Sequence, residues 1–245
     1  MISMNLQNKI VCLTGATGGI GSALATTLHA AGAHLILLGR DADKLALQGQ
    51  ALQATTYPCD LTDRQSRQTC LNKIIADVPT LDILIHAAGI GIYKPLPDVT
   101  QADWDTSFAL NVEAPFFLTQ ALTPLLEKSL DSLILTLGSG AGTIPMRGRS
   151  LYCATKFALR GLTLSLAEET AGTPPKHCLI TLGSTLTSFG PLSLEKKVEE
   201  SLNGKAYFTP DWVATKLVEI MQDDARDTEI TLFPGDYGFG EWHKP

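Results

Sequence analysis

The stretch TGATGGIGSALATTLHAAG, residues Thr14 to Gly32, decides the fold. It follows the apolar run KIVCL at residues 9–13, and its glycine-rich first half leads into an amphipathic helical pattern. A glycine-rich turn between a strand and a helix lets backbone N–H groups approach a diphosphate, and the helix N-terminus adds a favourable dipole. A glycine cluster alone is weak evidence, because it can be a merely tight turn. At the start of a repeated βα pattern it predicts a dinucleotide-binding turn.

The same alternation of short apolar runs and longer amphipathic stretches continues along the chain, which is typical of a parallel sheet covered on both faces. We therefore expect one Rossmann-like, doubly wound α/β domain over residues 1–245. The stretch 183–206 breaks the rhythm and predicts a substrate lid with a short helix. Helix starts are expected at Thr100, with Asp103 three residues on, and at Thr209 before Pro210. The predicted strands are Lys9–Thr14, His34–Leu38, Thr55–Cys59, Ile83–His86, Leu133–Leu137, His177–Leu182 and Glu229–Phe233.

Composition excludes several classes of partner. The net charge is −6 and the charged residues are interspersed without a basic stripe, so we expect no nucleic acid partner. The five cysteines are an odd number without a C-x-x-C pair or a histidine at zinc-ligand spacing, which favours free thiols and no metal site. No basic segment precedes an apolar core at the start, and no run reaches about 18 apolar residues. We expect a cytoplasmic protein with no secretion signal and no membrane contact.

The end of the second strand indicates the type of dinucleotide. It reads LILLGRD, with Arg40 where a carboxylate would bind the 2′-hydroxyl of NAD. A guanidinium favours the extra phosphate, so NADP(H) is favoured over NAD(H). Two alternatives stay open, because a rotated loop could present Asp41 and Arg40 could be a solvated surface charge. Asp60, after the third strand, either faces the adenine or is a turn or N-cap residue.

Polar groups also gather after the fifth strand. The segment LILTLGSGAG ends this strand at Ser139, and YCATK follows thirteen residues later. Tyr152 and Lys156 are one helical turn apart and therefore share a face. Open α/β sheets bind ligands at the carboxyl ends of their strands, so Ser139 and the Tyr152–Lys156 face are expected to converge.

Together these motifs resemble the short-chain dehydrogenase/reductase (SDR) family in its classical branch. The matching segments are TGATGGIG, the HAAG of residues 86–89 as a variant of NNAG, Asn111 in FALNV, Ser139, and YCATK as YxxxK. The chain departs from the family pattern at Leu182-Gly183, where Pro-Gly is usual, and at His86, where asparagine is usual. His86 fits a satisfied core histidine as well as a functional group, and we assign it no chemical role. The resemblance implies four catalytic residues: Asn111, Ser139, Tyr152 and Lys156. It implies cofactor contacts from Thr14, Gly15, Thr17, Gly19, Ile20, Gly21, Arg40, Asp60, Leu61, Ala88, Gly89, Asn111, Tyr152, Lys156, Thr185 and Thr187.

The expected chemistry is interconversion of a carbonyl and an alcohol by hydride transfer, with Tyr152 as general acid or base. A cation about 4 Å away, at an effective dielectric of about 20, is worth roughly 4 kcal/mol. Lys156 is therefore expected to lower the pKa of Tyr152. Ser139 is expected to donate to the substrate oxygen, with a backbone cap as its alternative. By resemblance, Lys156 also binds the nicotinamide ribose, Asn111 holds a water beside it, and the chain forms a homodimer or homotetramer through the helices that carry Asn111 and Tyr152.

The pocket is expected between Gly140–Ser150, Gly91–Tyr93 and the lid. Its apolar side chains suit a small-molecule ketone, aldehyde or 3-oxoacyl-type substrate. Arg147 and Arg149 could meet an acidic group or could be solvated. Two other functions are weighed. The intact Ser139, Tyr152 and Lys156 argue against a non-catalytic NADP-binding regulator. The short chain after the sixth strand argues against an epimerase or dehydratase, although Gly15, Gly18 and Gly21 also fit that branch's spacing.

Overall fold

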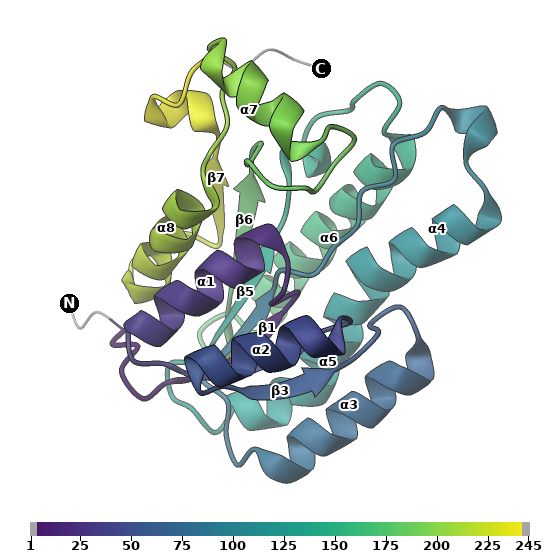
Figure 1. Cartoon of the computed structure of the whole chain (residues 1–245). Helices are drawn as coiled ribbons and strands as arrows, with labels where there is room; N and C mark the ends of the chain where they lie inside the picture. The colour runs from purple at the N-terminus through teal and green to yellow at the C-terminus, as the bar shows by residue number, and fades with distance from the viewer. Residues whose placement is uncertain (1–3, 242–245) are drawn as a thin grey trace.

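The structure is a computed structural model that describes residues 4–241, and the expectations that fall on residues 1–3 and 242–245 lie outside it. The described chain forms a sheet of seven strands in the order β3-β2-β1-β4-β5-β6-β7 (Figure 1). Every neighbouring pair is parallel. The strands are β1 (Ile10–Thr14), β2 (His34–Gly39), β3 (Thr55–Pro58), β4 (Ile83–His86), β5 (Leu133–Leu137), β6 (Lys176–Leu182) and β7 (Glu229–Leu232).

The predicted Rossmann-like fold is therefore confirmed, and no predicted strand end differs from the observed one by more than one residue. The reason is burial. Each residue of β4 and β5 is buried, so these strands read as uninterrupted apolar runs in the sequence.

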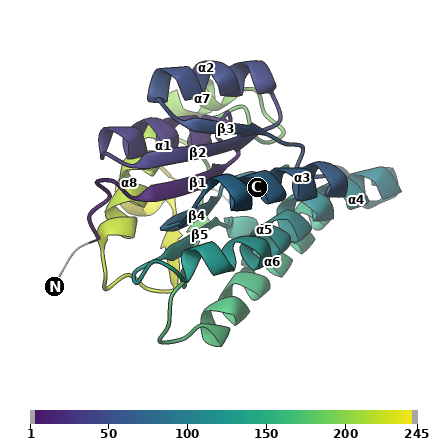
Figure 2. The ribbon, with the colours of Figure 1, turned by 90° about the horizontal axis from the view of Figure 1, so that it is seen from below.

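Helices cover both faces of the sheet. Figure 2 shows α1, α2 and α8 on one side, and α3, α5 and α6 on the other. The helix starts predicted at Thr100 and Thr209 are confirmed, since both side chains cap their helices. The helices are α1 (Gly19–Ala30), α2 (Ala42–Leu52), α3 (Arg64–Asp77), α4 (Gln101–Phe108), α5 (Ala114–Leu126), α6 (Ser150–Glu169), α7 (Leu194–Leu202) and α8 (Pro210–Gln222).

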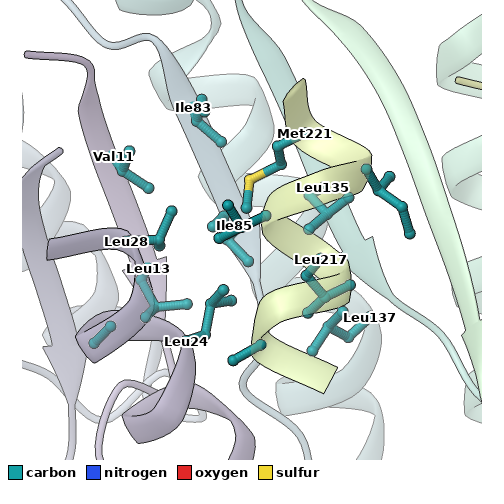
Figure 3. Packing of buried hydrophobic residues seen from close by; sticks show 14 of the residues in the cluster. Val11, Leu13, Leu24, Leu28, Ile83, Ile85, Leu135, Leu137, Leu217 and Met221 are labelled. Atoms are coloured by element: carbon teal, nitrogen blue, oxygen red, sulfur yellow. The ribbon is translucent and has the colours of Figure 1, made fainter. Parts of the chain in front are cut away.

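The core on the α1 and α8 side fixes the start of α1 in place. Leu24 and Leu28 of α1 and Leu217 and Met221 of α8 pack against the sheet and are fully buried (Figure 3). Burying a leucine side chain contributes about 1.5–3 kcal/mol. The glycine turn between β1 and α1 is therefore held on a rigid helix. The sheet side chains labelled in Figure 3 are Val11, Leu13, Ile83, Ile85, Leu135 and Leu137.

The stretch 183–206 leaves the sheet and contains the predicted short helix, α7. Its two ends are tied together, because Leu186 N donates to Phe208 O at 2.9 Å and Phe208 N donates to Ser184 O at 2.9 Å. Gly183 N also donates to Leu232 O at 2.8 Å. These bonds anchor the loop that lacks the proline usual at position 182.

Three further expectations can be compared with residues 4–241. No helix in this range is long and apolar enough to cross a membrane. No group of three or more potential metal ligands occurs among these residues. All five cysteines are buried and unpaired.

Candidate active site

The glycine turn lies where the strand order reverses, between β1 and β4. Thr14 Oγ1 donates to Ile85 O at 3.2 Å and accepts from the backbone N–H groups of Ala87 and Ala88 at 3.1 and 3.2 Å. Gly15 has φ +69°, and a Cβ at this position would lie 2.8 Å from Ala88 N. Only glycine allows the turn and the HAAG segment to pack this closely.

The turn has the features that an anionic group needs. Gly18 precedes α1 and makes no side-chain cap, so α1 offers the N–H groups of its first turn, which contains Gly19, Ile20 and Gly21. The stretch 183–206 reaches this point, because a Cβ on Gly19 would lie 2.5 Å from Thr187 Cγ2. Thr185, two residues before Thr187 in the chain, forms an isolated β-bridge with Phe208. The residues present therefore fit the diphosphate of a dinucleotide.

Other predicted cofactor residues surround the turn. Thr14, Leu61 and Ala88 border one small gap in the packing together with His86, and this gap is too small to hold a water molecule. A Cβ on Gly39, the last residue of β2, would lie 3.2 Å from Thr17 Oγ1. The turn thus adjoins the end of β2, where Arg40 follows.

At the end of β2, the Asp41 carboxylate is engaged by α2. It accepts from Lys44 N at 3.0 Å and pairs with Lys44 Nζ at 3.2 Å, while the Arg40 side chain is exposed. The hydrogen bond from Lys44 N holds the pKa of Asp41 below its ordinary value. The exposed Arg40 agrees with a solvated surface charge as well as with a phosphate contact, so its role towards the cofactor stays a prediction.

Asp60 is a turn residue. Its carboxylate accepts from the backbone N–H and the hydroxyl of Thr62 at 2.9 and 2.7 Å, which lowers its pKa together with the Arg40 charge. The turn interpretation is confirmed, and the N-cap of α3 is Asp63 instead. An adenine contact at Asp60 stays a prediction.

Ser139, Tyr152 and Lys156 converge beyond β5, as expected from their spacing. The Ser139 side chain lies close enough to the Tyr152 hydroxyl to lower the pKa of Tyr152. Ser139 Oγ accepts from Ala141 N at 3.1 Å, which confirms the backbone-cap interpretation, while donation to a substrate oxygen stays a prediction. Lys156 Nζ lies 5.9 Å from the centre of the Tyr152 ring and donates to Leu137 O at 3.0 Å.

Asn111 lies in a π-helical turn, Ala109–Glu113, between α4 and α5, rather than in a regular helix. Its Oδ1 accepts from Ile90 N at 2.9 Å, and its Nδ2 donates to Ile90 O at 2.8 Å and to Thr155 Oγ1 at 3.0 Å. A Cβ on Gly89 would lie 3.3 Å from Asn111 Oδ1 and 3.9 Å from Lys156 Nζ. This buried amide therefore has hydrogen-bond partners on both of its polar atoms, and Asn111 adjoins Lys156.

The expected low pKa of Tyr152 is wrong for this structure. Burial raises the pKa of Tyr152 to about 12, against lowering contributions from the Ser139 hydrogen bond and the Arg149 charge. Burial also lowers the pKa of Lys156 to about 8. The ion-pair attraction was expected before desolvation is subtracted, and in this structure the desolvation of both side chains is the larger effect.

Aromatic and lid residues enclose Tyr152, whose side chain is only 6% exposed. The Tyr93 and Phe189 rings lie 5.3 and 5.9 Å from its ring, and Met146 packs in the same cluster. These contacts agree with the predicted apolar pocket. The structure also shows that Lys197 of α7 is buried. Sequence reasoning missed this residue because the segment EKKVEE reads as a solvated charge run.

His86 is a satisfied core histidine. Its Nε2 and Thr119 Oγ1 are 2.9 Å apart, and burial lowers its pKa to about 3. It is therefore neutral at physiological pH and takes no part in the polar cluster around Tyr152.

Similarity to known proteins covers most of the chain. A model of the short chain dehydrogenase family matches residues 9–195. Dehydrogenase/reductase SDR family member 4 of Pongo abelii is 33% identical over 204 residues, which cover 80% of this chain and 73% of that protein. A 3-oxoacyl-(acyl-carrier-protein) reductase of Rickettsia felis is 29% identical over 234 residues, which cover 91% of this chain and 92% of that protein.

Solved structures agree. A short chain dehydrogenase from Burkholderia cenocepacia in complex with NADP superimposes with a TM-score of 0.83 at 27% identity, covering 94% of this chain and 98% of that one. A short chain dehydrogenase from Shigella flexneri complexed with NADP superimposes with a TM-score of 0.80 at 28% identity, covering 93% of this chain and 98% of that one. With the family model matching more than half of its length, the chain belongs to the short-chain dehydrogenase family of NAD(P)-dependent oxidoreductases.

Proposed function

We propose that this enzyme interconverts a carbonyl compound and an alcohol with NADP(H), with Tyr152 as general acid in reduction and general base in oxidation. The observation that carries the proposal is the convergence of Tyr152, Ser139 and Lys156 beyond the carboxyl end of β5, where Lys156 Nζ lies 5.9 Å from the centre of the Tyr152 ring and donates to Leu137 O. A phenol, a second hydroxyl and a buried cation at one point are the groups that proton transfer to a carbonyl oxygen requires.

NADP(H) would be held by the glycine turn, by Arg40 at the adenosine end and by Lys156 and Thr187 at the nicotinamide end. When bound, it supplies or accepts the hydride at the reacting carbon. The exposed Arg40 and the engagement of Asp41 by Lys44 support the preference for NADP(H). The NADP bound to the relatives from Burkholderia cenocepacia and Shigella flexneri supports it as well.

The raised pKa of Tyr152, about 12, keeps the phenol protonated at neutral pH. The residue is thus already in the form that reduction needs. As the phenol releases its proton to the substrate oxygen, Ser139 donates a hydrogen bond to that oxygen, and the positive charges of Lys156 and Arg149 stabilise the phenolate. Asn111 adjoins Lys156 and holds the water that connects it to solvent.

A 3-oxoacyl-type substrate is the narrower form of this proposal, supported by the Rickettsia felis relative, which matches over nearly its whole length. The stretch 183–206 acts as the substrate lid, since Phe189 lies on Tyr152. We further infer a cytoplasmic enzyme, which the five free cysteines support, and a homodimer or homotetramer.

Absorbance at 340 nm, followed with NADPH or NADH and a panel of ketones, tests the proposal. We expect oxidation of NADPH, slower use of NADH, and loss of at least about 100-fold in kcat for Tyr152→Phe with nearly unchanged NADPH affinity. Near wild-type turnover in Tyr152→Phe would refute the role of the phenol. Efficient use of NADH with little use of NADPH would refute the role of Arg40.

A further inference from the structure

Lys156 and Lys197 are the lysines of the described chain with less than a tenth of their surface exposed, at 6% and 7%. Neither forms an ion pair with a carboxylate among residues 4–241. A buried cation without a counter-ion is costly, and such a group beside an active site is a candidate for ligand binding. Lys156 has its proposed role at the nicotinamide ribose. Lys197 has none in the proposed mechanism.

Lys197 lies on the substrate side of the site. Its Nζ donates to Thr187 O at 2.8 Å and makes a second hydrogen bond to Phe189 O, which leaves one of its three N–H groups without an acceptor. A Cβ on Gly190 would lie 3.6 Å from Lys197 Nζ and 4.0 Å from the Tyr93 hydroxyl oxygen. The ammonium and the hydroxyl therefore flank the same point of the lid.

Tyr93 connects this point to the catalytic tyrosine and to a second cation. Its ring lies 5.3 Å from the Tyr152 ring, and its hydroxyl has no hydrogen-bond partner among the described residues. The Arg149 guanidinium lies 5.2 Å from the centre of the Tyr93 ring, and its Nη1 contacts Met146 Sδ at 3.4 Å. Arg149 is likewise absent from the ion pairs of residues 4–241.

The nearest acid on the lid helix is directed elsewhere. Glu200 pairs with Lys205 at 2.8 Å and hydrogen-bonds the Tyr207 hydroxyl. Two cations and an unpartnered hydroxyl thus surround the aromatic pocket, and an anionic substrate group would supply the missing counter-charge.

We propose that Lys197, Arg149 and the Tyr93 hydroxyl form a carboxylate subsite, so that the enzyme acts on oxo acids and the corresponding hydroxy acids. This inference rests on the proposed carbonyl–alcohol activity and names its substrate class. Lys197 would bind the carboxylate with its remaining N–H while its other two hydrogen bonds keep the lid over Tyr152.

Paired substrates test the subsite: 3-oxobutanoate, 4-oxopentanoate and 5-oxohexanoate, each against its methyl ester, with NADPH. We expect the best acid to exceed its ester about 10- to 100-fold in kcat/KM, since a charge-assisted hydrogen bond is lost in the ester. In Lys197→Met the ratio should fall below about 3 with NADPH affinity little changed, because the acid loses its charge partner in addition to any slowing that acid and ester share through the lost lid hydrogen bonds. Arg149→Met should also reduce the ratio, and Lys197→Arg should keep most of it.

Lys196→Met is the matched control, because it removes the same charge from an exposed position paired with Glu199 on the same helix, and it should keep the wild-type ratio. Esters reduced as well as acids by the wild type would overturn the subsite while leaving the carbonyl reductase activity intact. Equal slowing of acid and ester in Lys197→Met would also overturn it, because Lys197 would then only support the lid. Weaker NADPH binding in Lys197→Met with an unchanged acid-to-ester ratio would also overturn the subsite, because Lys197 would then act on the cofactor and not on the substrate.

Discussion

Single residues in this site show how burial and charge compete. Tyr152 and Lys156 both lose solvation, and their pKa values move apart, from 10.0 and 10.5 to about 12 and about 8. At neutral pH the phenol keeps its proton and the amine is mostly charged. The pair is thus prepared for reduction, in which Tyr152 must donate.

A second buried group, His86, predicts how stability responds to acid. Burial is the main cause of its pKa of about 3, with a smaller contribution from the His177 charge. Below pH 6.5 the unfolded chain takes up a proton that the folded chain does not. The stability present above pH 6.5 therefore declines as the pH falls towards 3, by about 1.4 kcal/mol for each pH unit from this group.

We expect His86→Asn to flatten this decline, since asparagine can hydrogen-bond Thr119 without titrating. Urea unfolding of both proteins between pH 7.5 and pH 5 measures the difference, and the comparison with wild type cancels the other titrating groups. If the two stability profiles ran parallel over that range, His86 would not be the neutral core group described above.

Among the elements, the π-helical turn is the one that shapes the site most directly. Asn111 satisfies both backbone groups of Ile90 and thereby ties the chain after β4 to the junction of α4 and α5. Such turns are uncommon and often occur at functional sites. Here the turn places the amide beside Gly89 and Lys156.

Asn111→Leu should therefore destabilise the fold by about 2–4 kcal/mol, because two backbone groups lose their partner in a partly buried place. Urea unfolding followed by tryptophan fluorescence measures it. Asn72→Leu, an exposed amide on α3, is the control and should change stability by less than about 0.5 kcal/mol. A similar small effect at both positions would mean that water replaces the amide at Ile90.

The elements also differ in how well the sequence predicts them. Strands β4 and β5 were predictable because burial on both faces leaves an apolar run with no alternative placement. The convergence of Ser139 and Tyr152 was predictable from parallel strand topology. The π-helical turn was not, because FALNV has ordinary helix composition and the extra residue in the turn comes from tertiary hydrogen bonds. Lys197 was missed for a similar reason, since its burial depends on where the lid lies.

On the scale of the whole molecule, the helices that carry Asn111 and Tyr152 leave large apolar side chains uncovered. Phe116 and Phe117 of α5 are 36% and 40% exposed, and Phe157 of α6 is 45% exposed. Exposed aromatic residues on neighbouring helices are typical of protein–protein interfaces. They support the proposed homodimer or homotetramer.

The oligomer can be tested by replacing the aromatic side chains with a charge. The wild type should sediment at a multiple of the 26.2 kDa of one chain. Phe116→Asp combined with Phe157→Asp should raise the dissociation constant at least about 100-fold, because a buried unpaired carboxylate costs several kcal/mol. Leu47→Asp, at a 69% exposed position of α2 on the other side of the sheet, is the control and should keep the wild-type mass. A wild type that sediments as a single chain at micromolar concentration would refute the assembly, and dissociation by Leu47→Asp would place the contact on the α2 side.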